Sequence, residues 1–104
     1  MPKQTNVTVY LTCTMQQEGD WYVTECTSLP VATQGKTDSE AMANMIEAIK
    51  MFLESCIKRN TLEKVLLRYK WRPRVTPPRD LPARTFSLPV PVPPVLLQRA
   101  NAKG

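Results

Sequence analysis

The chain has 104 residues and a net charge of +5, which is enough sequence for one small domain and too little for two hydrophobic cores. It contains no histidine, the commonest general base and metal ligand, and its three cysteines lack zinc or CxxC spacing, so we expect no metal, no cofactor and no disulfide framework. No apolar run approaches the roughly 20 residues that span a membrane, and no signal-peptide segment precedes the first strand pattern, which favours a cytoplasmic protein.

A β-hairpin is predicted near the N-terminal end. Apolar and polar residues alternate over 7–15, as in a half-buried strand, and 21–26 is predicted to be the returning strand. Gly19 lies between them and can take positive φ, so we place the turn centre at Glu18 and Gly19. This register sets the following residues opposite each other: Met15 and Tyr22, Cys13 and Thr24, and Leu11 and Cys26.

The three cysteines are expected to be small buried apolar residues. In the predicted register, Cys13 and Cys26 lie diagonally on one face of the hairpin, whereas a disulfide prefers Cα atoms about 5.5 to 6 Å apart. Free cysteine usually packs as a small apolar side chain, and Cys56 falls on the apolar stripe of a predicted helix.

A long helix is predicted over 38–58. Leu29-Pro30 ends the second strand, and 31–36 can form a short third strand before the helix. Thr37 can then accept the Glu40 N–H while Glu40 accepts the Thr37 N–H, which is the reciprocal capping box. Apolar residues follow with the spacing of one buried helical stripe: Ala41, Met45, Ala48, Ile49, Phe52, Leu53 and Cys56.

A shorter second helix is predicted to reach about Lys70, with Asn60 and Glu63 as its capping box. Trp71 is expected to close the core after it, so residues 1–72 form the predicted core. The apolar face of this helix consists of Leu62, Val65, Leu66 and Tyr69.

Proline dominates the C-terminal third. Eight prolines between Pro73 and Pro94 exclude a continued helix, so 73–84 is predicted to be a linker rich in proline and arginine. Over 85–93, apolar residues alternate with prolines, and these prolines all remove N–H donors from the same edge of the strand. This pattern favours an edge strand, which either completes the sheet of its own chain or is swapped to a partner. A polyproline II arm is the alternative. Residues 94–104 are expected to be a flexible tail.

The predicted class is α+β, with a small antiparallel sheet in the order strand, strand, strand, helix, helix, strand packed on one long helix. Four groups of residues have a familiar order and spacing: Gly19-Asp20-Trp21-Tyr22-Val23, Leu29-Pro30 followed by Gln34-Gly35, Thr37 before Glu40-Ala41, and Asn44-Met45-Ile46-Glu47-Ala48-Ile49. In these residues the chain resembles the HicB-like antitoxin domain, an incomplete ribonuclease H-like fold. The resemblance covers roughly residues 7–70, and the strand at 85–92 would extend it.

The resemblance implies a binding protein. Members of that family bind and neutralise a small HicA-like toxin that cleaves RNA, so a HicA-like toxin is the implied partner. Active ribonuclease H-like proteins hold two metals with carboxylates, one of them on the first strand, and residues 7–15 contain no acid. Glu40, Glu47 and Glu54 recur at intervals of seven and are expected to form the solvated face of the long helix. We therefore predict no enzyme activity and no catalytic residues.

Charge is divided between the two halves of the chain. Residues 1–56 have a net charge of −4, whereas 57–104 have eleven lysines and arginines against two carboxylates, a net charge of +9. This division favours two surfaces with different partners, or one half that folds back electrostatically on the other. Nucleic-acid binding by a small basic protein is the alternative function, and Tyr69 and Trp71 would then be available for stacking on bases. A basic solvated face without a ligand explains the charge pattern equally well. The candidate nucleic-acid or partner contacts are Lys58, Arg59, Lys64, Arg68, Lys70, Arg72 and Arg74.

A homodimer or higher homo-oligomer is the third prediction. Small α+β domains with a free sheet edge often pair through it, and the long linker would allow the last strand to be exchanged between two copies. The candidate oligomer edge consists of Phe86, Leu88, Val90 and Val92.

Overall fold

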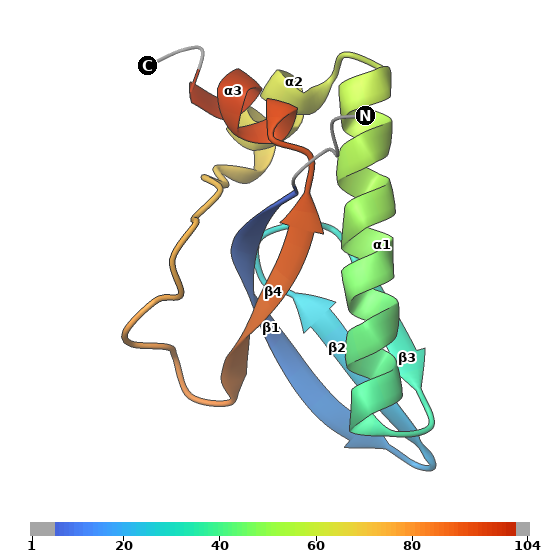
Figure 1. The fold of residues 1–104 in the computed structure, drawn as a ribbon. Coiled ribbons are helices and arrows are strands. Elements are labelled where there is room, and N and C mark those ends of the chain that lie inside the picture. The colour runs from blue at the N-terminus through green and yellow to red at the C-terminus, as the bar shows by residue number, and fades with distance from the viewer. Residues whose placement is uncertain (1–5, 102–104) are drawn as a thin grey trace.

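The computed structural model describes residues 6–101 and arranges them as four strands and three helices (Figure 1). The strands form one antiparallel sheet in the order β3-β2-β1-β4, and α1 lies along one face of it. The predicted α+β class is confirmed. No helix in this part of the chain has both the length and the apolar character needed to cross a membrane. The elements are β1 (Val7–Glu18), β2 (Trp21–Cys26), β3 (Ala32–Gly35), α1 (Asp38–Lys58), α2 (Leu62–Tyr69), β4 (Thr85–Val92) and α3 (Val95–Asn101).

The hydrophobic core lies between α1 and the inner face of the sheet. Alternate residues of a strand point to the same face, and Val9 of β1 and its partner Val90 of β4 are fully buried there. Ile49 and Leu53 on the predicted stripe of α1 have no exposed surface. Trp71, which follows α2, is 6% exposed and belongs to the same core, so its predicted role is confirmed.

The hairpin register differs from the prediction. Glu18 pairs with Trp21, so Gly19 and Asp20 are the two turn residues, and Gly19 has a φ of +62°. Primed two-residue turns need positive φ at their first central position, which glycine supplies without a steric cost. The predicted turn centre is therefore one residue too early, and the predicted strand pairing is wrong. In the observed register Met15 lies opposite Thr24, and Cys13 lies directly opposite Cys26.

The start of α1 confirms half of the predicted capping box. The Thr37 hydroxyl accepts a hydrogen bond from the Glu40 N–H at 3.0 Å. The Glu40 carboxylate, however, accepts the N–H of Lys36 at 2.8 Å and not that of Thr37. This bond ties the residue after β3 to the first turn of α1. Gly35, which is buried, comes directly before Lys36 at the end of β3. The end of β3 and the start of α1 are therefore held close together.

The predicted capping box at the start of α2 is wrong. Asn60 has a φ of +60°, a left-handed conformation that asparagine tolerates, and its Oδ1 accepts a hydrogen bond from Arg99 of α3. Thr61 precedes the helix, and its side chain makes no capping bond. Asn60 therefore shapes the tight turn between α1 and α2, which leaves Glu63 exposed in the first turn of α2.

β4 is an edge strand and pairs with β1 of the same chain. The N–H of Tyr10 on β1 donates to the Arg74 carbonyl at 2.9 Å, away from β4, so Tyr10 and its partner Pro89 form a non-hydrogen-bonded pair. The missing N–H groups of Pro89 and Pro91 consequently lie on the outer edge of the sheet. Residues 72–84 lead to β4 along the side of the sheet away from α1 (Figure 1).

Residues 95–101 are not part of a flexible tail, so this part of the prediction for 94–104 is wrong. They form α3, which contacts α2, and Leu96 has no exposed surface. The carbonyls of Pro93 and Pro94 accept the N–H groups of Leu96 and Leu97 at 3.0 Å each. Proline is well tolerated in the first turn of a helix, where an N–H would have no helical partner, so the proline-rich run ends as a helix start. The rest of the predicted tail, 102–104, lies outside the described residues.

Candidate interaction site

Groups that could hold a metal do not converge in the described part of the chain. Among residues 6–101, no three Cys, Asp or Glu side chains lie close enough together to bind a metal ion. A cleft of about 210 Å³ lies between the C-terminal end of α1 and the start of α3, and it is lined by Glu54, Ile57, Lys58, Pro93 and Val95. Small-molecule sites usually enclose about 300 to 1,000 Å³. This cleft is therefore smaller than a usual small-molecule site, and the candidate sites described below are exposed surfaces.

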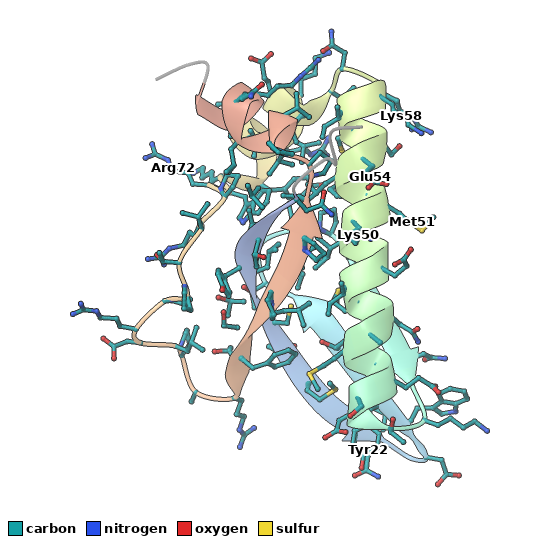
Figure 2. All side chains as sticks on the ribbon, viewed as in Figure 1. Tyr22, Lys50, Met51, Glu54, Lys58 and Arg72 are labelled. Carbon is teal, nitrogen blue, oxygen red and sulfur yellow. The ribbon has the colours of Figure 1, made fainter. Side chains whose placement is uncertain are left out.

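The seven predicted basic contact residues are all exposed. Figure 1 shows α2 at the same end of the molecule as the C-terminal end of α1, so most of these residues gather at that end. Figure 2 shows Lys58 and Arg72 on opposite sides of it, and Arg74 lies further along, beside β1. We call this region the basic end. In chain order its residues are Lys58, Arg59, Lys64, Arg68, Lys70, Arg72 and Arg74.

The aromatic residues of the basic end are not free to stack on bases. Trp71 is a core residue, with 6% of its surface exposed. Tyr69 is partly buried, and the Arg68 guanidinium lies over its ring at 5.8 Å from the ring centroid. Base stacking requires an open aromatic face. The basic end therefore offers phosphate attraction without a stacking platform.

A second surface runs along α1 on the side away from the sheet. We call it the outer stripe, and its exposed residues, spaced so that they share one helix face, are Glu40, Glu47, Met51, Glu54 and Lys58. Exposure of the three glutamates agrees with the predicted solvated face. Met51 is the unexpected member, because 61% of its surface is exposed within one turn of Glu47 and Glu54. Figure 2 shows Met51 and Lys58 projecting from α1 away from the sheet.

The outer stripe continues into the cleft, because Glu54 and Lys58 belong to both. Ile57, Pro93 and Val95 add apolar surface at that end. Met51 and the cleft thus supply apolar surface, and the charged side chains of Glu47, Glu54 and Lys58 lie beside it. Protein interfaces commonly combine an apolar centre with a polar rim. We call the outer stripe together with the cleft residues the α1 face.

Sequence reasoning did not identify Met51 as a site residue. A signal was present, because Met51 falls outside the apolar stripe of the helix and between two glutamates of its solvated face. The cleft has no comparable signal. It depends on Val95 at the start of α3, and α3 itself was not expected in a proline-rich segment.

The candidate oligomer edge is turned inward. Leu88, Val90 and Val92 are at most 3% exposed and belong to the core of their own chain, and Phe86 is partly buried against it. Along its outer edge β4 presents backbone groups, and Pro89 and Pro91 provide no donors there. Association of two copies through this strand, with or without exchange of the strand, stays a prediction.

No protein-family model matches the chain, and no similar protein was found among curated proteins or solved structures. The likeness to HicB-like antitoxins therefore depends on the residues quoted above for it.

Proposed function

We propose that this chain is a HicB-like interaction protein that binds and neutralises a small HicA-like ribonuclease toxin, without catalysis of its own. The residues that carry the resemblance lie in the hairpin, in the loop between β2 and β3, in β3, and in α1 with its N-cap. These elements follow one another in the order that the resemblance implies. The proposal implies a cytoplasmic protein, because the RNA targets of such a toxin are found there.

The exposure of Met51 at the centre of the α1 face is the observation that carries the proposal. A protein that cleaves RNA has to bind phosphates, so its active surface is expected to be basic. The glutamates of the outer stripe complement such a surface in charge, and Met51 with the cleft supplies an apolar contact. Inhibition follows if the α1 face covers the RNA-binding surface of the toxin.

Charge reversal on the outer stripe is expected to weaken this complex at least tenfold. In the double variant Glu47→Lys, Glu54→Lys, two lysines would face a basic partner, and juxtaposed like charges cost several kcal/mol. Both residues are exposed, so the fold is expected to tolerate the change. The proposal expects a neighbouring reading frame to encode a small basic protein. The dissociation constant is measured by calorimetry against that protein, and its RNA cleavage is measured in parallel.

The matched control reverses two charges at the basic end. Lys64→Glu with Arg68→Glu changes two exposed residues one turn apart on α2 and is expected to leave toxin binding within about twofold, since exposed charges away from an interface contribute little. If the control variant loses binding while the outer-stripe variant keeps it, the toxin-facing surface proposed here is wrong. If the neighbouring protein does not bind the chain at all, the antitoxin proposal fails.

Nucleic-acid binding is the second candidate function, and the exposed basic end is the observation that favours it. Binding to phosphates releases counterions, so the affinity for a single-stranded RNA oligonucleotide is expected to fall steeply with salt. The same two variants separate the functions. This candidate would be supported if the affinity for RNA falls in the Lys64→Glu, Arg68→Glu variant and is unchanged by charge reversal on the outer stripe. An affinity for RNA that is the same at low and moderate salt would count against it.

A further inference from the structure

The observed hairpin register brings two cysteines face to face. Cys13 of β1 and Cys26 of β2 are direct partners in the antiparallel ladder. The Cys26 N–H donates to the Val31 carbonyl, on the side of β2 away from β1, so the two cysteines form a non-hydrogen-bonded pair. Cα atoms in such pairs are about 4.5 Å apart, at the short end of the roughly 4.4 to 6.8 Å that disulfides span. The two thiols can therefore be bridged without a rearrangement of the strands.

The two thiols have different surroundings. Cys13 has no exposed surface, whereas Cys26 is partly exposed. The backbone N–H of Leu29 donates to the Cys26 sulfur at 3.4 Å. A backbone donor aimed at sulfur stabilises a thiolate, and only an accessible thiolate can attack a disulfide from solution. Geometry thus assigns Cys26 as the attacking thiol and Cys13 as the thiol that reacts second.

The acid–base properties of the pair agree with this assignment. The pKa of Cys26 is lowered to about 6, chiefly by a hydrogen bond from the Cys13 thiol and further by the backbone N–H groups of Leu29 and Ser28, while partial burial opposes the shift. The same hydrogen bond and burial raise the pKa of Cys13. Both directions favour a thiolate at Cys26 and a thiol at Cys13.

We propose that Cys13 and Cys26 form a reversible dithiol site that reacts with small disulfides such as oxidised glutathione. The Cys26 thiolate attacks one sulfur of glutathione disulfide, which forms a mixed disulfide on Cys26 and releases one glutathione thiolate. Cys13 then loses its proton to water and attacks the Cys26 sulfur, which closes the Cys13–Cys26 bond and releases the second glutathione thiolate. Two protein thiols are oxidised and one disulfide is reduced to two thiols.

A bridge between these strands is expected to be easily reversed. The expected Cα separation lies at the edge of the range for disulfides, and bridges with unfavourable geometry are the readily reduced ones. Cys56 offers no such chemistry, because it is buried in the last turn of α1. This proposal does not depend on the antitoxin proposal, because it concerns the hairpin and not the α1 face.

The test uses the full chain with Cys56→Ser, which leaves the Cys13–Cys26 pair untouched. Incubation with millimolar oxidised glutathione is expected to remove both free thiols and to lower the intact mass by that of two hydrogens, and a dithiol reductant is expected to restore both thiols. Retention of both thiols, or a stable glutathione adduct in place of the mass loss, would overturn the proposal. Because neither reacting cysteine is changed, the result does not depend on whether a Cys13 variant folds.

The roles of the two cysteines are tested separately in the Cys56→Ser background. With Cys13→Ser, the reaction is expected to stop at a stable glutathione adduct on Cys26, and with Cys26→Ser no adduct is expected. An adduct on Cys13 that forms as fast as the one on Cys26 would reverse the assignment.

The pH dependence provides an independent readout. A thiol with a pKa of about 6 is almost fully ionised at pH 7, so the rate of the first step is expected to rise less than about twofold from pH 7 to pH 8. An ordinary thiol with a pKa of about 8.5 would react about eightfold faster over the same interval. A rise of that size would contradict the assignment of Cys26 as a thiolate.

Discussion

Replacing Gly35 by alanine is expected to lower the free energy of unfolding by about 3 kcal/mol, the upper part of the usual range for overpacking. A Cβ atom at this position would lie 2.6 Å from the backbone nitrogen of Ala41 and 2.9 Å from the carbonyl carbon of Glu40. Both are backbone atoms in the first turn of α1, so rotation of a side chain cannot relieve the overlap. β3 would have to move away from α1, against the hydrogen bond between Lys36 and Glu40.

Urea unfolding followed by circular dichroism measures this loss. Gly19→Ala is the comparison, because no atom lies within 4 Å of a Cβ there and the variant carries only the strain of a positive φ. Its expected cost is about 1 to 2 kcal/mol. If the Gly35→Ala variant unfolds at the same urea concentration as the parent chain, the close packing of β3 against α1 is wrong.

Truncation of Ile49 to alanine is expected to cost about 2 to 5 kcal/mol, because it removes a buried side chain and leaves a cavity. Ile49 has no exposed surface and lies on the stripe of α1 that faces the sheet. A loss of 3 kcal/mol in a domain of this size lowers the melting temperature by more than about 10 °C. Thermal and urea unfolding together give the value.

Met51→Ala is the matched control for Ile49, since it truncates an apolar side chain on the opposite face of the same helix. Met51 is 61% exposed, so the change in stability is expected to be within about 0.5 kcal/mol. The same variant is expected to weaken binding of the toxin, which separates packing from recognition. Equal losses of stability in the two variants would contradict the division of α1 into a buried and an exposed face.

The periodicity of apolar residues was sufficient to predict most of the framework. Burial of one face of an element produces a periodic pattern of apolar residues in the sequence. Such patterns are present in the strand at 7–15 and in the helix from Ala41 to Cys56. The bounds predicted for α1, 38–58, agree with the structure because Thr37 is a true N-cap. The α+β class follows from the order of these elements.

The predicted structure was wrong at positions where one residue type is compatible with two local conformations. Gly19 can occupy either central position of a two-residue turn, and the wrong choice shifts every pair of the hairpin. Asn60 can cap a helix through its side chain or adopt positive φ in a turn, and it adopts the latter. Pro93 and Pro94 cannot continue a helix but can start one, so α3 was missed.

The candidate surfaces depend on tertiary structure more than the framework does. The basic residues could be counted from the sequence, but their gathering at one end of the molecule depends on how α2 turns back from α1. Burial of Trp71, which removes it from nucleic-acid contacts, was anticipated as one of two readings. The pairing of Cys13 with Cys26 could not be anticipated, because it depends on the register that was wrong.

Oxidation of Met51 by hydrogen peroxide tests the partner surface most directly. Met51 is 61% exposed and Met45 is fully buried, so in the free chain Met51 is expected to form its sulfoxide far sooner. In a saturated complex with the small basic protein that the proposal expects a neighbouring reading frame to encode, the oxidation rate of Met51 is expected to fall towards that of Met45. A Met51 rate that is the same in the complex and in the free chain would contradict binding through the α1 face.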